Sequence, residues 1–228
     1  MHKILITLAM TVTLIRPLYA EDLTSINLPL FDVMHGMKTE WVAKKMIYNG
    51  QPMSIQNFSI NRSPKDVVRH FESRWKVQGM GQLKHQKIGD ELTIGFVDRG
   101  YTYSVQVREN KSGSVGSLVV TRNKEFKQTK IQFPIYPDSQ VVSRIHSVDM
   151  GVKSETITLS SYRSASMQKQ WYRSILQRNG WIGQEGSAEN RGQTLEYQKG
   201  KELCQLIFMG KNTIKDNRSI VMIHWIKG

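Results

Sequence analysis

Apolar and polar residues alternate along several short stretches of this chain, a pattern typical of β-strands with one buried face. The first such stretch begins at Met46. Apolar residues then recur every four positions at Val67, Phe71 and Trp75, which places them on one face of a helix. The pattern therefore predicts a strand followed by a helix that packs on a sheet.

Both ends of this helix carry recognisable signals. Ser63 can cap the start, because its side chain accepts a hydrogen bond from an otherwise unpaired backbone N–H. Pro64 suits the first helical position, and Asp66 completes the spacing of a capping box. Gly79 is placed to end the helix. Three further strands are expected at 91–97, 101–108 and 114–121.

The chain also contains an internal repeat. Segments 57–80 and 158–181 align without a gap at an offset of 101 residues. Equivalent positions include Ser63 and Ser164, Phe71 and Tyr172, and Gly79 and Gly180. The second copy thus predicts a second capped helix, with three more strands at 193–198, 203–209 and 218–227. The side chains expected to pack from this helix are Met167, Trp171, Tyr172, Ile175 and Leu176.

This repeat predicts an α+β fold of two tandem units. Each unit is expected to contain a strand, a helix and a three-stranded antiparallel meander, with the helix packed on one sheet face. The expected boundaries are a signal peptide at 1–20, an irregular lead-in at 21–45, a first unit at 46–122, a basic Pro-containing linker at 123–137 and a second unit at 138–228. Structural roles are predicted for Ser63, Phe71, Trp75, Gly79, Ser164, Trp171, Tyr172, Leu176, Gly180 and Trp181.

The second half carries a short motif that extends this interpretation. Tyr136-Pro137 is followed downstream by Tyr172, Leu176, Gly180 and Trp181, in the spacing Tyr-x3-Leu-x3-Gly-Trp. This resembles a motif of uncharacterised bacterial exported proteins, in which a YPG segment leads into a strand; Asp138 stands in place of that glycine. The tandem arrangement is similar to periplasmic helix-on-sheet accessory domains such as those of BamC, without a lipid-attached cysteine. The resemblance implies fold and location, because a fold alone does not dictate function.

Residues 1–20 have the pattern of a secretory signal peptide. A positive start at Lys3 precedes an apolar stretch that Arg16 and Pro17 interrupt, and Ala20 ends the segment. Because a spanning helix needs roughly 20 apolar residues, this stretch is too short to cross a bilayer. We expect cleavage and export to the periplasm as a soluble chain without a transmembrane segment; a permanent N-terminal anchor is the alternative.

Residues suited to catalysis are scattered. None of the six histidines stands at metal-ligand spacing, and Cys204 lies in an alternating run where a small buried residue is expected. Two Ser-x-x-Lys sequences, at Ser73 and Ser166, lack the partner motifs of penicillin-recognising enzymes. The carboxylates form no evident acid–base pair, and no glycine-rich phosphate loop is present. We therefore expect no catalytic residue, no metal, no cofactor and no nucleic-acid partner.

The chain is strongly basic, with a formal net charge of +13. Such a surface favours anionic partners, although dispersed charge also serves solubility alone. Candidate residues for binding an anionic lipid or glycan are Arg122, Lys124, Lys127, Lys130 and Arg144.

Together these features suggest a non-enzymatic periplasmic scaffold or adaptor of a secretion, pilus or outer-membrane assembly, which binds envelope proteins. The alternative is a binder or carrier of an anionic envelope molecule. A hydrolase with a site built from scattered residues is a third hypothesis. A homodimer is compatible with each of them, because an open sheet edge can pair with a second copy.

Overall fold

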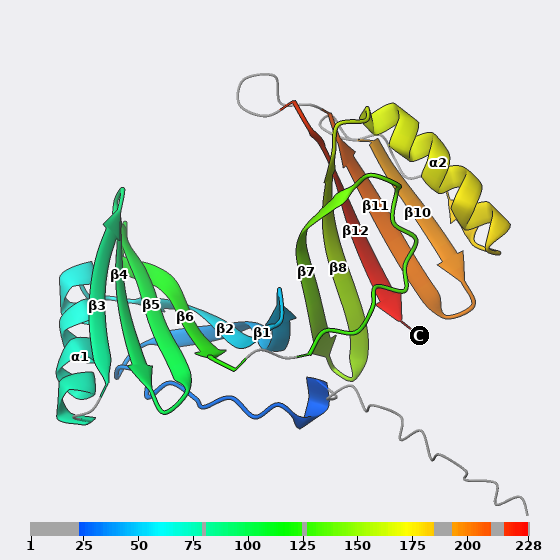
Figure 1. Cartoon of the computed structure of the whole chain (residues 1–228). Helices are drawn as coiled ribbons and strands as arrows, with labels where there is room; N and C mark the ends of the chain where they lie inside the picture. The colour runs from blue at the N-terminus through cyan, green and yellow to red at the C-terminus, as the bar shows by residue number, and fades with distance from the viewer. Residues whose placement is uncertain (1–22, 79–80, 125–126, 185–192, 211–216, 228) are drawn as a thin grey trace, which may run out of the picture.

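A computed structural model of the chain describes residues 23–78, 81–124, 127–184, 193–210 and 217–227. These residues form one continuous antiparallel sheet of twelve strands, in the order β3-β4-β5-β6-β2-β1-β7-β8-β12-β11-β10-β9. Two α-helices pack on this sheet, one in each half of the chain (Figure 1). The proposed signal peptide at 1–20 lies outside the described residues.

The order of elements is the same in both halves: a two-stranded hairpin, a helix and four more strands. The first half contains β1 (Lys38–Tyr48), β2 (Gln51–Ile60), α1 (Pro64–Gln78), β3 (Gln82–Ile88), β4 (Glu91–Asp98), β5 (Tyr101–Asn110) and β6 (Gly113–Arg122). The second contains β7 (Gln140–Asp149), β8 (Val152–Ser161), α2 (Ala165–Arg178), β9 (Ile182–Gln184), β10 (Gln193–Lys199), β11 (Glu202–Met209) and β12 (Ser219–Lys227). A short 3-10 helix, η1 (Leu23–Ser25), precedes them.

The predicted fold class, an α+β fold of tandem units, is wrong. The structure is mostly β, with one sheet that runs through both halves and helices of only 15 and 14 residues. The prediction missed β1, which begins at Lys38 inside the expected lead-in, and β3. It failed because both strands are largely exposed, so their sequences lack the alternation that marks a buried strand face.

The two halves meet where β1 pairs with β7. Met46 lies opposite Ser147, which is 101 residues further along the chain, so equivalent strands pair at equivalent positions. Asn49, in the β1–β2 turn at φ 48°, extends the pairing. Its N–H donates to the Arg144 carbonyl oxygen at 2.9 Å, and its Oδ1 accepts from the Arg144 N–H at 2.8 Å. This seam makes the sheet continuous.

The lead-in segment covers the seam. Leu23 and Ile26 pack with Ile47 of β1, and Val148 of β7 packs against the same cluster. Ile47 and Val148 are equivalent positions in the two halves. The burial of these side chains stabilises the seam, because apolar surface from both halves is removed from water together.

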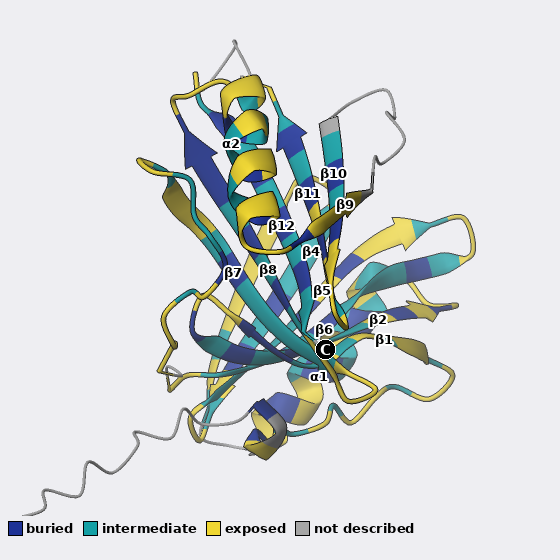
Figure 2. Cartoon of the chain, turned by 90° about the vertical axis from the view of Figure 1, so that its right-hand side faces the viewer, coloured by how far each residue is buried: buried dark blue, intermediate teal, exposed yellow. Residues whose placement is uncertain are grey.

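Each half also has an apolar cluster between its helix and the sheet. Helix α1 places Val67, Phe71 and Trp75 against β4 and β5. Helix α2 places Tyr172 and Leu176 against β11 and β12, and its exposed side faces outward (Figure 2). The predicted apolar face of the second helix is displaced by one position. Met167 is 51% exposed, whereas Gln168 is buried and Trp171 is half-buried.

The segment expected to be a linker is partly core. Phe133 is buried against the rings of Trp181 and Trp225. The N–H of Tyr136 donates to the Tyr172 hydroxyl at 3.2 Å, which fixes the Tyr-Pro motif beside α2. The lead-in makes a similar contact in the first half, where the ring of Phe31 packs edge-on against Phe71.

The helix ends follow local rules. Ser63 and Ser164 accept hydrogen bonds from the backbone N–H groups of Asp66 and Met167, each at 3.2 Å. After α2, the N–H of Trp181 donates to the Leu176 carbonyl, while Gly180 adopts φ 78°. This geometry is a Schellman motif, and it places Trp181 in the core. Gly79 lies outside the described residues.

Candidate functional site

Both helices, the lead-in and the 127–136 segment lie on the same face of the sheet. The pairing register puts the residues that contact them on that face in both halves. No described element packs on the opposite face, which we call the uncovered face. A sheet face left open to solvent across so many strands is the first candidate for a binding surface.

The uncovered face is unusual in its composition. Over their full lengths, β2, β6, β8, β11 and β12 contribute no Asp, Glu, Lys or Arg to it. They present serine, threonine and amide side chains among half-buried apolar ones. Half-buried apolar residues on this face are Val119, Ile55, Ile145, Met222 and Ile207, and Met46 of β1 on the same face is buried. Charged residues on this face lie on other strands, among them Lys38 and Glu40 of β1, Arg108 of β5 and Glu196 of β10. In a chain of net charge +13, these five strands therefore form two charge-free areas, β6–β2 and β8–β12–β11.

A hollow of about 270 Å³ opens on the uncovered face over β10, β11 and β12. Leu203 and Ile226 give it an apolar lining. Polar groups surround them: the Gln205 amide donates to the Glu196 carboxylate at 2.8 Å, and His224 Nδ1 lies 2.9 Å from the Thr156 hydroxyl. The arrangement suits an apolar side chain with a few polar contacts. Among the described residues, no three His, Cys, Asp or Glu side chains come together as metal ligands would.

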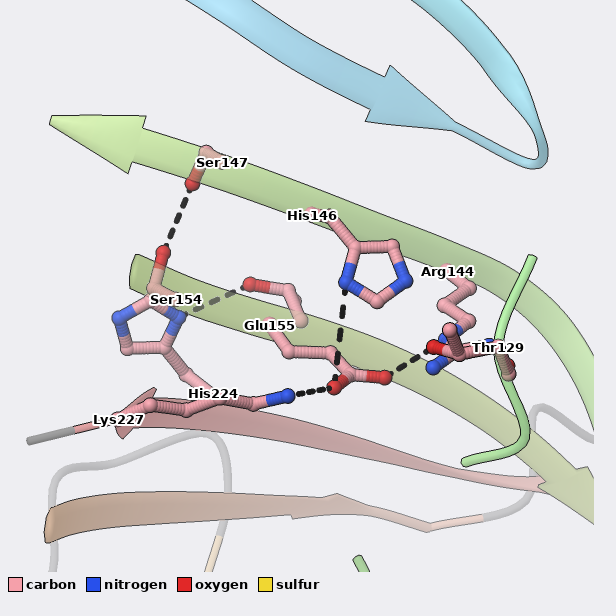
Figure 3. A network of polar contacts seen from close by, with 9 residues as sticks. Thr129, Arg144, His146, Ser147, Ser154, Glu155, His224 and Lys227 are labelled. Carbon is pink, nitrogen blue, oxygen red and sulfur yellow. Dashed lines mark hydrogen bonds and ion pairs between the residues drawn. The ribbon is translucent and has the colours of Figure 1, made fainter. Parts of the chain in front are cut away.

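A buried ionic cluster lies on the helix side of the sheet, near the seam (Figure 3). The Glu155 side chain has no exposed surface and is held by two cations. Arg144 Nε lies 2.6 Å from one carboxylate oxygen, and Lys227 Nζ lies 2.8 Å from the other. Arg144 Nη1 also donates to the Thr129 carbonyl oxygen. The cluster thus connects β7, β8 and β12 with the segment between the two halves.

The environment of this cluster changes its ionisation. Burial acts to raise the pKa of Glu155, but hydrogen bonds from Lys227 and Arg144 outweigh it and hold the pKa below its usual value. His146 Nδ1 lies 4.0 Å from Glu155. Burial lowers the pKa of His146 despite this carboxylate. At neutral pH the cluster therefore combines a charged carboxylate with a neutral imidazole.

We expect the protein to lose stability as the pH falls from about 7.5 to about 5. The lowered pKa of His146 means that the unfolded chain takes up a proton first, so folding stability falls as pH drops below the ordinary histidine value. The lowered pKa of Glu155 acts in the same direction at lower pH. Urea midpoints measured across this range should fall with pH. A His146→Gln variant should show a shallower fall than the wild-type chain between pH 7.5 and 5.5, about the range of histidine titration; an equal slope would contradict the role of His146.

The predicted basic residues do not form one site. Lys124, Lys127 and Lys130 are exposed on the segment that follows β6, and Arg122 is half-buried at the end of that strand. Arg144 is only 5% exposed and is paired with Glu155, so its charge is not presented to a partner. Instead, Arg144 holds the segment that carries the lysines, through Thr129. Sequence alone gave no signal for this pairing.

Cys204 is buried and makes no disulfide. Burial raises the pKa of its thiol to about 12, so the thiol stays protonated and unreactive at neutral pH.

No protein-family model, curated protein or solved structure matches this chain. Neither of the two described helices is long and apolar enough to cross a membrane.

Proposed function

We propose that the chain is an exported, non-enzymatic scaffold or adaptor that binds other proteins of the cell envelope through its uncovered face. Its place would be an assembly for secretion, pilus formation or outer-membrane biogenesis. The observation that carries the proposal is the charge-free surface of β6 and β2 and of β8, β12 and β11 in an otherwise basic protein.

The chemistry of this face favours a protein partner. Charged residues are depleted and methionine is enriched in the buried centres of protein interfaces, and this face has both properties. A polyanion would gain little from it, because five of its strands offer no cation there. Exposed apolar area of this kind is stabilised when a complementary surface removes it from water.

The size of the face is also sufficient. The five charge-free strands are each roughly 30 Å long and about 4.8 Å wide. Their combined area of about 700 Å² is close to the roughly 800 Å² that each partner buries in a stable interface.

A charge placed on the face tests the proposal. We expect Met222→Lys to abolish capture of envelope proteins by the tagged chain, because a partner would have to desolvate the new ammonium group. Met167→Lys makes the same change at an exposed position of α2 and should leave capture intact. Melting curves check that both variants fold. Equal capture by the two variants, or no captured protein with the wild-type chain, would contradict the proposal.

Binding of an anionic lipid or glycan is the second candidate function, supported by the exposed Lys124, Lys127 and Lys130. Vesicles with anionic headgroups should then bind the chain at low salt and release it at high salt, because ions screen exposed charges. Replacing the three lysines by glutamine should remove the binding, whereas Met222→Lys should not reduce it. Binding that ignores salt, or that survives loss of the lysines, would count against an electrostatic site.

A further inference from the structure

Strand β3 is an open edge of the sheet. It pairs with β4 on one side only, and six of its seven residues are exposed. Helix α1 packs on β4 and β5, whereas in the second half α2 also packs on the edge strand, β9. The described part of β9 is three residues long, and it ends where the described residues stop at 184. The described edges are therefore unequal, and β3 offers the longer row of unpaired backbone groups.

The β3–β4 turn defines which backbone groups are unpaired. Ile88 lies opposite Glu91 across the two-residue turn at Gly89 and Asp90, and such closing pairs exchange both backbone hydrogen bonds. Because bonded and non-bonded positions alternate along an antiparallel strand, the N–H and C=O groups of Leu83, His85 and Lys87 point away from β4.

Beside this edge lies a hollow of about 300 Å³ between α1 and β3. Val68 and Leu92 contribute its apolar lining, and His85 and Lys87 border it. A strand that paired with β3 could place an apolar side chain in this hollow.

The charge of β3 indicates which kind of partner strand it favours. Strand β3 carries Lys84 and Lys87 and no acidic residue. Glu72 of α1 lies 2.6 Å from Lys76 Nζ and 3.8 Å from His85 Nε2 of β3, so neither lysine of β3 is its partner. Self-pairing of two copies through β3 would give neither lysine an acidic partner. An acidic strand would instead place opposite charge beside these lysines, which lie on opposite faces of β3.

We propose that β3 receives an extended, acidic segment of a partner protein as an added strand. The backbone of this segment bonds to Leu83, His85 and Lys87. Its acidic side chains lie beside Lys84 on the face away from α1, and an apolar side chain on the α1 side fills the hollow beside Val68. This site is separate from the uncovered face, so neither proposal depends on the other.

Two labelled peptides of about the length of β3 test the proposal by fluorescence anisotropy. One alternates glutamate with valine, and the other alternates lysine with valine. We expect the acidic peptide to bind the full chain and the basic peptide not to bind. Hydrogen exchange should show protection of the β3 amides of Leu83, His85 and Lys87 in the presence of the acidic peptide.

Substitutions distinguish strand addition from general attraction between charges. His85→Pro removes an outward N–H without breaking the ladder to β4, and should weaken binding about tenfold or more. Lys84→Glu combined with Lys87→Glu leaves the backbone unchanged and should reverse the preference between the two peptides. Equal binding of both peptides, no binding of either, or protection outside β3 would overturn the proposal. Dimerisation of the wild-type chain through β3 would also overturn it.

Discussion

Replacement of Glu155 by alanine is expected to lower the free energy of unfolding by about 3–5 kcal/mol, because it leaves Arg144 and Lys227 without their shared counter-ion. Arg144 is almost fully buried, so its charge would remain desolvated without compensation. The contact from Arg144 to Thr129 would also lose its orientation. Urea unfolding of the two chains measures the difference.

A surface ion pair gives the control for this prediction. Glu72→Ala breaks the pair with Lys76 on α1, where both side chains are partly solvated. Such pairs contribute up to about 0.5 kcal/mol, so this variant should unfold close to wild type. Equal effects of Glu155→Ala and Glu72→Ala would show that the buried cluster does not hold the second half together.

Replacement of Tyr172 by alanine is expected to cost about 3–5 kcal/mol, because the side chain is fully buried and its loss leaves a cavity. Its ring packs against Trp171 and Phe208, and its hydroxyl accepts the Tyr136 N–H. The variant should therefore also loosen the segment that leads into β7. Thermal or urea unfolding provides the measurement.

Two further substitutions separate the contribution of the Tyr172 hydrogen bond from that of its buried ring. Tyr172→Phe removes only the hydrogen bond to Tyr136 and should cost about 1 kcal/mol. Trp171→Ala should cost less than Tyr172→Ala, because Trp171 is only half-buried beside Tyr136. A larger loss from Trp171→Ala would mean that the core of the second half lies on a different side of α2.

The helices were the most predictable elements, because local chemistry defines them. Ser63 and Ser164 cap the helices in the structure, and Gly180 occupies the left-handed conformation expected after α2. Asp138, which stands in place of the glycine of the YPG motif, adopts φ 62°, a region that favours glycine. Local signals of this kind need no knowledge of the rest of the fold.

The continuous sheet was not predictable in the same way. The β1–β7 seam depends on backbone pairing and on Asn49, which leave no hydrophobic pattern in the sequence. The apolar residues that cover it, such as Ile26, Ile47 and Val148, are too far apart along the chain to form a local pattern. Strand β3 reads as a polar segment because an edge strand has little surface to bury. The pairing of distant strands therefore determined the fold class, and the hydrophobic pattern of the sequence does not show this pairing.

The candidate site residues likewise differ in how far the sequence predicts them. The exposure of Lys127 and Lys130 agrees with their basic, polar context, but Arg144 could not be assigned from the sequence. Its partner Glu155 lies 11 residues away on the next strand and looks like any solvated carboxylate. The uncovered face could not be predicted from the sequence either. The alternation of apolar and polar residues predicts the strands, but it does not show which sheet face the helices leave open.

The uncovered face is tested most directly by photo-crosslinking in intact cells. A photoreactive amino acid replaces Thr158 on the uncovered face in one variant and Gln170 on the exposed side of α2 in another. We expect Thr158 to crosslink to a different envelope protein, identified by mass spectrometry, and Gln170 to give no such product. Crosslinks from Gln170 but not from Thr158, or products that contain only a second copy of the chain, would contradict an adaptor that binds its partners through this face.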